Sequence, residues 1–286
     1  MVDHSQNSDG TLAYAQRGCR GGKPLFFFHG WPGSRIESAL ADKAATDFGI
    51  HVVAPDRPGF GLSPFQPGRK ISDWPATIAE LAGELGWNRF SIFAVSGGTP
   101  YALVCAKELA DRIDSVGVCS GVPAHDWHEA EDTPLLSPAR LARFRHSRPH
   151  IMKAMVRLLR SYLSRSTGDS FLTAAALLMP ESDRQIFRTS EVKGMFAASV
   201  REALRGPLEG SNHDLGLLTS PWPVSATDLQ SPIRYWHGDQ DSICPITGMK
   251  SVLEKATQHS LEVLDGEGHF SLPVNRIKEI LAYFAS

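Results

Sequence analysis

The chain has 286 residues, of which 42% are apolar and 21% are charged, a balance typical of soluble globular proteins. A net charge of −2 gives no overall attraction to nucleic acid, and we expect no nucleic-acid partner. No apolar run approaches the length of a membrane span, and the polar segment 1–7 lacks the pattern of a secretory signal. We therefore expect a cytoplasmic protein without stable membrane insertion.

Short apolar runs rich in β-branched and aromatic residues recur along the chain and predict β-strands. The first run, 11–16, alternates between apolar and polar residues, and we expect an antiparallel edge strand there. The others are 25–28, 51–54, 90–95, 116–119, 233–236 and 261–264. Helix-like stretches such as 36–48 and 74–85 separate most of these runs. This alternation predicts an α/β fold with a mostly parallel, doubly wound sheet and helices on both faces.

The strand pattern stops after 122 and resumes at 233, and helical periodicity fills the interval. Prolines divide this interval into short helices, and we expect it to form a helical cap inserted into the sheet domain. The predicted boundaries place the core domain at 1–122 and 230–286 and the cap at 123–229. An independent helical domain is the alternative, although such a domain is normally appended rather than inserted.

One part of the predicted cap is strongly basic. Between Pro134 and Gly168 there is no Asp or Glu, and the cations are Arg140, Arg143, Arg145, Arg148, Lys153, Arg157, Arg160 and Arg165. Such a segment attracts an anionic substrate or a membrane surface, or it is a solvated helix face whose counter-charges come from the core domain. Apolar residues interleave at helical spacing, which favours the solvated helix.

A serine lies where a predicted strand meets a predicted helix, in the segment Ala94-Val95-Ser96-Gly97-Gly98. A tight strand-to-helix turn strains the backbone of the serine and leaves room only for small residues two positions before and after it. Ala94 and Gly98 meet this requirement, so the segment matches a nucleophile elbow in which alanine replaces the first glycine of G-x-S-x-G. The structural alternative is a Gly-Gly turn in an ordinary βα unit.

A nucleophilic serine needs a base that takes its proton and an acid that orients the base. His269 suits the base, since it follows a predicted strand and lies in a loop beside Gly268. Two acids, Asp239 and Asp241, follow another predicted strand. A serine, an acid and a histidine in this order, each at the C-terminal end of a strand, favour catalysis over a chance loop histidine.

Backbone amides that face a developing oxyanion complete such a site. A turn rich in glycine and proline, 29–34, directly follows the strand at 25–28. The N–H groups of Trp31 and of Gly97, just after the serine, are the candidate donors of an oxyanion hole. A purely structural turn is the alternative.

Across essentially its whole length, the chain resembles enzymes of the α/β-hydrolase fold. The matching segments are 29–32, 56–63, 94–98, 238–245 and 268–269. The resemblance implies that Ser96 is the nucleophile, that Asp241 rather than Asp239 is the triad acid, and that His269 acts as base and then as acid. It also implies that Trp31 and Gly97 form the oxyanion hole, and we expect the substrate pocket under the cap to include Trp31 and Phe60.

The residue at the elbow separates activities within that superfamily. The segment His29–Pro32 is similar to epoxide hydrolases, but those enzymes and haloalkane dehalogenases carry aspartate at the elbow, so Ser96 speaks against both. Serine points to acyl chemistry, and we expect a serine hydrolase of the carboxylesterase or lactonase class that cleaves a small ester or lactone through an acyl-enzyme. A cofactor-free perhydrolase similar to haloperoxidases is one alternative, and a non-enzymatic ligand receptor is another. We expect no cofactor and no metal ion, because no histidine or cysteine spacing suggests metal ligands.

Overall fold

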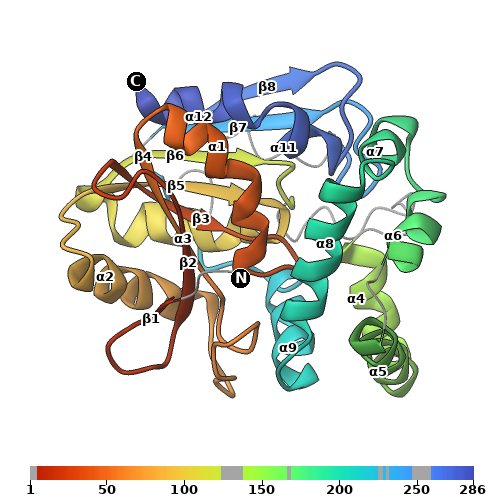
Figure 1. The fold of residues 1–286 in the computed structure, drawn as a ribbon. Helices are drawn as coiled ribbons and strands as arrows, with labels where there is room; N and C mark the ends of the chain where they lie inside the picture. The colour runs from red at the N-terminus through yellow and green to blue at the C-terminus, as the bar shows by residue number, and fades with distance from the viewer. Residues whose placement is uncertain (1–4, 124–137, 166–168, 225–227, 230–231, 247–258) are drawn as a thin grey trace.

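The computed structural model describes residues 5–123, 138–165, 169–224, 228–229, 232–246 and 259–286. Eight strands form one sheet in the order β1-β2-β4-β3-β5-β6-β7-β8 (Figure 1). The strands are β1 (Ser5–Gln6), β2 (Ala13–Gly18), β3 (Lys23–Phe28), β4 (Ile50–Pro55), β5 (Phe90–Val95), β6 (Ile113–Cys119), β7 (Ile233–Gly238) and β8 (Ser260–Leu264). From β4 to β8 in the sheet order all neighbours are parallel, whereas β2 is antiparallel to both β1 and β4.

The six apolar runs predicted as strands are therefore confirmed as β3 to β8. The antiparallel direction predicted for the first run is confirmed as well. Its predicted position at the edge is wrong, because the short strand β1 pairs with the outer side of β2 and takes the edge.

Side chains of β3 alternate between the two faces of the sheet, which explains why helices cover both. Phe26 and Phe28 belong to the hydrophobic cluster that packs against α2 (Trp74–Glu84) and α3 (Thr99–Glu108). Phe27, between them, belongs to the cluster on the opposite face, which packs against α1 (Asp42–Asp47) and α12 (Ile277–Ala285). Each buried phenylalanine contributes about 1.5–3 kcal/mol relative to an exposed one. Shorter helical turns are η1 (Arg35–Ala41), η2 (Ile71–Asp73), η3 (Ser96–Gly98), η4 (Ala110–Arg112) and α11 (Ser271–Asn275).

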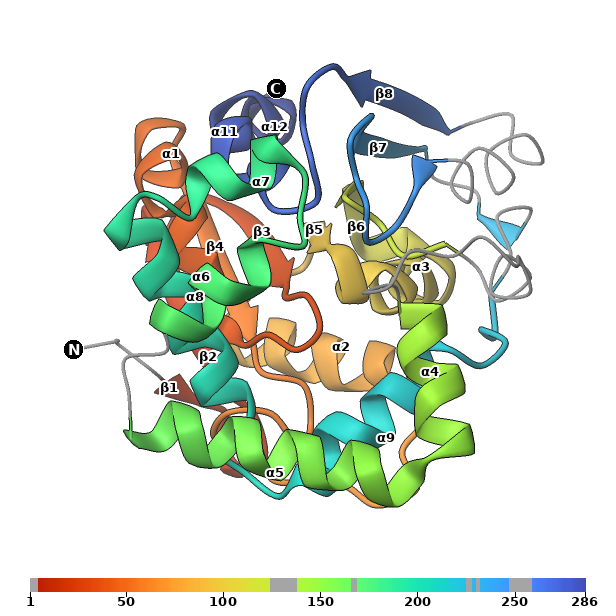
Figure 2. The same cartoon turned by 90° about the vertical axis from the view of Figure 1, so that its right-hand side faces the viewer.

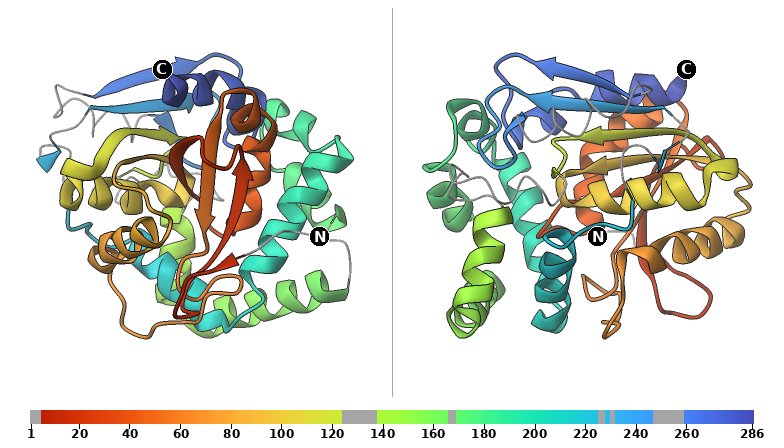
Figure 3. Two further views of the ribbon diagram at one scale, coloured as in Figure 1. Left: turned by 60° about the vertical axis from the view of Figure 1, so that its left-hand side comes forward. Right: turned by 180° about the vertical axis from the view of Figure 1, so that it is seen from behind.

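Helices occupy the interval between β6 and β7, as the periodicity predicts. They are α4 (Pro138–Ser147), α5 (Pro149–Arg165), α6 (Asp169–Ala176), α7 (Glu181–Ile186), α8 (Ser190–Ala203) and α9 (Leu208–Leu218), which we call the cap helices. They lie beyond the C-terminal ends of the parallel strands, toward which the arrowheads point (Figures 1 and 3). The domain boundaries remain a prediction, since 124–137, 225–227 and 230–231 lie outside the described residues.

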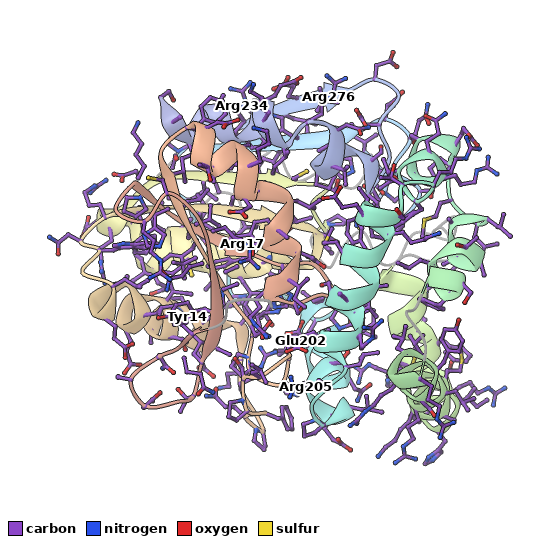
Figure 4. All side chains as sticks on the ribbon, in the orientation of Figure 1. Tyr14, Arg17, Glu202, Arg205, Arg234 and Arg276 are labelled. Atoms are coloured by element: carbon purple, nitrogen blue, oxygen red, sulfur yellow. The ribbon has the colours of Figure 1, made fainter. Side chains whose placement is uncertain are left out.

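The cap helices join the core partly through an ion pair. The Arg35 guanidinium of η1 pairs with Glu202 of α8 at 2.9 Å, and Glu202 lies beside Arg205 at the lower end of α8 (Figure 4). Arg35 also pairs with Asp56, which follows β4, at 2.5 Å. A buried charge without partners costs several kcal/mol, so these contacts fix α8 against η1. Among the helices that the structure describes, none is long and apolar enough to cross a membrane.

Candidate active site

Ser96 occupies the strained position that the sequence predicts, between β5 and α3. Its φ angle is 48°, in the left-handed region that non-glycine residues seldom adopt. Ala94 is fully buried, and a Cβ atom at Gly98 would lie 2.5 Å from the carbonyl oxygen of Phe28. Both flanking positions therefore require small side chains, and a strained residue held this way is typical of functional sites.

Two loops bring an imidazole and a carboxylate to this serine. His269 lies between β8 and α11, and its Nε2 is 3.0 Å from the Oγ of Ser96. Asp241 follows β7, and its Oδ2 is 2.8 Å from the Nδ1 of His269. A carboxylate only accepts hydrogen bonds, so Nδ1 carries the proton and Nε2 is free to accept the hydroxyl proton of Ser96. The three side chains thus form the line that proton transfer from serine needs.

Burial and charge act in opposite directions on this pair. Burial lowers the pKa of His269, but the Asp241 carboxylate and its hydrogen bond raise it, and the result lies above the ordinary value. Burial raises the pKa of Asp241, but His269 lowers it, and the result lies below the ordinary value. A low acid pKa beside a raised histidine pKa is the arrangement that stabilises an imidazolium during proton transfer.

A second imidazole contacts the same carboxylate. His237, at the end of β7, has its Nε2 2.6 Å from the carbonyl oxygen of Cys244 and 3.4 Å from Oδ2 of Asp241. Burial lowers the pKa of His237, which favours its neutral form. The Asp241 carboxylate also accepts the backbone N–H groups of Ile243 and Cys244, at 2.9 and 2.8 Å. These contacts hold the acid in the orientation that it presents to His269.

The two amides predicted for the oxyanion hole lie next to each other. A Cβ atom at Gly97 would be 3.0 Å from the backbone nitrogen of Trp31 and 2.9 Å from its Cβ, so the two loops touch at this point. The peptide bond between Trp31 and Pro32 is cis. The amide of Gly30, just before Trp31, donates to the buried Glu37 carboxylate at 2.8 Å, which fixes the turn.

The two residues predicted to line the substrate pocket lie in different surroundings. Trp31 is partly buried and lines a cavity of about 270 Å³ between the cap helices α5 and α9. Phe60 is fully buried, with its ring centre 5.3 Å from that of His29 and 5.1 Å from the guanidinium of Arg57, and it is not among the residues that line this cavity.

Sequence reasoning missed a buried carboxylate that the cap places against the histidine loop. Asp183 of α7 accepts the backbone N–H groups of His269, Phe270 and Ser271 at 3.1, 2.9 and 2.8 Å. A Cβ atom at Gly268 would lie 2.5 Å from the Asp183 carboxylate, so only glycine allows this approach. The one signal in the sequence was an acid in the first turn of a helix, which ordinarily indicates no more than capping.

A second missed carboxylate connects the cap to the turn that contains Trp31. Asp214 of α9 pairs with Arg57 at 3.0 Å, with Arg69, and with the hydroxyl of Tyr101 at 2.5 Å. Arg57 in turn donates to the carbonyl oxygens of His29 and Gly30, at 2.7 and 3.0 Å. Arg57 therefore connects the Asp214 carboxylate of the cap to the backbone just before the Trp31 amide.

Known proteins match both the sequence and the shape of the chain. Residues 23–275 match the family model described as alpha/beta hydrolase fold. An uncharacterized hydrolase of Bacillus subtilis, YcgS, is 25% identical over 124 residues, which are 43% of this chain and only 42% of that protein.

Solved structures extend the likeness to nearly the whole chain. A bromoperoxidase from Bacillus anthracis superposes with a TM-score of 0.70 at 21% identity, over 96% of this chain and 94% of that one. A thermophilic esterase from Thermogutta terrifontis superposes with a TM-score of 0.64 at 22% identity, over the same shares of the two chains. At these identities the structural likeness establishes the fold.

Proposed function

Because this chain belongs to the alpha/beta hydrolase fold family, we propose that it is a serine hydrolase that cleaves a small carboxylic ester or lactone. One observation carries the proposal: Ser96, His269 and Asp241 form an unbroken hydrogen-bonded line, with distances of 3.0 and 2.8 Å. Serine, unlike aspartate at the same elbow, forms an acyl-enzyme with an ester or lactone.

In the proposed reaction the Oγ of Ser96 attacks the acyl carbonyl while Nε2 of His269 takes the hydroxyl proton. The carbonyl oxygen becomes an oxyanion that the amides of Trp31 and Gly97 stabilise. The C–O bond to the alcohol then breaks, and His269 returns the proton to the leaving oxygen. A water molecule, deprotonated by His269, attacks the acyl-enzyme, and the carboxylic acid leaves as Ser96 regains its proton.

Labelling with a fluorophosphonate tests the nucleophile directly, because this probe phosphonylates an activated serine. We expect wild-type protein to be labelled and Ser96→Ala to remain unlabelled. Ser91→Ala is a matched control, since Ser91 lies on the same strand and bonds the hydroxyl of Ser115 at 2.9 Å, outside the site. Absence of labelling in the folded wild type contradicts the proposal and favours a ligand receptor. Equal labelling of Ser96→Ala also contradicts it, because a residue other than Ser96 then reacts with the probe.

The likeness to a bromoperoxidase favours a second candidate, a cofactor-free perhydrolase on the same three residues. Such an enzyme transfers the acyl group from Ser96 to hydrogen peroxide instead of water, and the peracid then oxidises halide. A peracid-dependent halogenation assay run beside a panel of esters and lactones separates the two activities. Hydrolysis faster than perhydrolysis across the panel supports the hydrolase.

A further inference from the structure

The cavity beside Trp31 lies within the cap rather than at the serine itself. Helix α9 lies against both α4 and α5 (Figure 2). Most of the walls are apolar, with Met152 and Val156 from α5 and Leu208 and Leu215 from α9. The polar part of the lining comes from Arg145, His150, Lys153, Glu209, Ser211 and Asn212. Apolar walls with polar groups that can orient a ligand are the usual form of a small-molecule site.

Two permanent cations line this cavity, and they differ in their partners. Lys153 pairs with Glu209 of α9 at 3.5 Å. The guanidinium of Arg145 makes no ion pair or hydrogen bond with any residue that the structure describes, and its Nε is buried without a partner. Such a group presents a fork of donors to the cavity, and a bidentate anion satisfies it best.

Gly216 in α9 leaves the room that the Arg145 guanidinium occupies. A Cβ atom at Gly216 would lie 3.1 Å from Nη2 of Arg145 and 3.5 Å from its Cζ. Glycine inside a helix costs about 1 kcal/mol relative to alanine, so its presence here is accounted for by the space that the guanidinium occupies. Arg145 is thereby held against α9 at the edge of the cavity.

The same face of α9 leads from the cavity to the candidate nucleophile. Leu208, Ser211, Leu215 and Leu218 recur at spacings of three or four residues and therefore share one side of the helix. The first three line the cavity, and the Cδ1 of Leu218 would lie 3.2 Å from a Cβ atom at Gly97. From Leu215 to Leu218 the helix rises about 4.5 Å, a distance that a short carbon chain spans.

Trp31 connects the two places. Its Nε1 donates to the carbonyl oxygen of Ser211 at 3.1 Å, on the cavity side, and its backbone lies against Gly97. Trp31 thus contacts the cavity wall through its indole and the residue next to Ser96 through its backbone.

We propose that this cavity binds the carboxylate of the substrate, so that the preferred substrate is an ester or lactone carrying a free carboxylate at its distal end. Arg145 donates to that carboxylate while the acyl carbonyl lies at Ser96, and the inference rests on the proposed function of the serine. A carboxylate fits better than a phosphate, because Glu209 already offsets the charge of Lys153 and the remaining guanidinium of Arg145 balances a single negative charge. Of the eight cations in the basic segment, Arg145 thus has a recognition role.

The test compares half-esters of dicarboxylic acids with neutral esters of equal chain length, such as monoethyl adipate and ethyl hexanoate. We expect wild-type kcat/KM to favour the charged ester, and Arg145→Met to lower the ratio of charged to neutral by about 10- to 100-fold, the usual worth of hydrogen bonds to a charged group. Arg148→Met is the matched control, because Arg148 carries the same charge at an exposed position and does not line the cavity. Its ratio should stay at the wild-type value.

Calorimetric titration of intact half-ester into Ser96→Ala measures recognition without hydrolysis. Binding that weakens by the same factor in the Ser96→Ala/Arg145→Met double variant supports the cavity site. Equal wild-type turnover of the charged and neutral esters overturns the inference while leaving the hydrolase intact, as does an equal loss in Arg148→Met. Arg145-dependent binding without cleavage of either ester supports the site and overturns the proposed hydrolase.

Discussion

The cap contributes two fully buried carboxylates to the core, Asp183 from α7 and Asp214 from α9, and they differ in the charge of their partners. Burial raises the pKa of Asp183, and the backbone amides that it accepts offset only part of this, so its pKa stays above the ordinary value. Burial raises the pKa of Asp214 as well, but Arg57 and Arg69 outweigh it and bring the pKa down to about 2. Dipoles are weaker partners than cations for a buried charge.

The difference suggests two kinds of connection between cap and core. Asp214 shares its charge with two guanidiniums, so its removal leaves buried cations and should mainly destabilise the fold. Among the residues that the structure describes, the Asp183 carboxylate bonds only to the loop that carries His269, so its removal should mainly disturb the position and the pKa of that imidazole. We therefore call Asp214 a clamp, which mainly affects stability, and Asp183 a positioning residue, which mainly affects catalysis.

We expect the largest effect on activity from substitution of the candidate triad acid, Asp241. We expect Asp241→Asn to lower kcat by about 10⁴-fold, because an asparagine presents the wrong partner to Nδ1 of His269. Asp239→Asn is the control, since the Asp239 carboxylate lies in an exposed turn and accepts the amide N–H of Gly266 at 2.8 Å. Ester hydrolysis by both variants is the measurement, and greater damage from Asp239→Asn would show that the acid is wrongly assigned.

Next in size is the effect of the clamp on stability. Asp214→Asn should lower the free energy of unfolding by about 3–5 kcal/mol, because Arg57 and Arg69 lose their counter-charge inside the core. Asp114→Asn breaks the exposed pair with Arg89, at 2.6 Å, and should cost under about 1 kcal/mol. Urea unfolding followed by circular dichroism gives both values. Equal losses of free energy of unfolding in the two variants would show that Asp214 is not a clamp.

Asp183→Asn should act on catalysis more than on folding. The amide oxygen of the asparagine still accepts two backbone N–H groups, but its NH₂ group then faces the N–H of His269, and two donors repel each other. The loop should therefore shift and kcat/KM should fall by about 10- to 100-fold. The Asp183 charge also contributes to raising the pKa of His269, so the acid limb of the pH–kcat/KM profile should move to lower pH.

A merely structural Asp183 leaves that limb in place, which makes the pH profile the deciding readout. Glu181→Gln on the same helix is the control, because Glu181 pairs with Arg184 and Arg188 at the surface, each at 3.0 Å. Its profile should match that of the wild type.

The smallest effect is on the pH dependence of stability. The pKa of Asp214 falls from 3.8 unfolded to about 2 folded, so its contribution of roughly 2 kcal/mol is present above pH 4 and is lost as pH falls toward 2. The gap between wild type and Asp214→Asn should therefore narrow in acid. Asp183 has a raised pKa, so the wild type should lose stability relative to Asp183→Asn as pH rises through that pKa. Urea unfolding at a series of pH values measures both trends. If the difference in free energy of unfolding from the wild type changes with pH in the same direction for both variants, the contrast between Asp214 and Asp183 is contradicted.

The sequence predicted the strands, and it singled out the three side chains that the structure brings together, because both depend on local patterns. Apolar runs mark strands wherever they fall in the sheet, and the elbow at Ser96 needs small neighbours only two residues away. The edge strand was mistaken because β1 has only two residues, Ser5 and Gln6, too few to show any period.

The role of the cap could not be predicted in the same way. Asp183 and His269 are 86 residues apart in sequence. Asp183 lies on a short helix of the cap and His269 in a loop of the core, so no shared local pattern connects them. Asp214 and Arg57 are separated by 157 residues, and nothing in their spacing indicates that both are buried. Long-range pairing of buried charges depends on how α7 and α9 dock, which no local pattern encodes.

The central claim is that Ser96 carries the acyl group, and peptide mapping of an acid-quenched reaction tests it most directly. Protein mixed with 4-nitrophenyl acetate and quenched within the first turnover should carry one acetyl group, on the peptide that contains Ser96. Asp241→Asn provides a slower version in which the adduct is easier to trap if deacylation is the slower step. An acetyl group on Ser96 that is absent from Ser96→Ala is the predicted result, and turnover by Ser96→Ala at the wild-type rate would contradict the account.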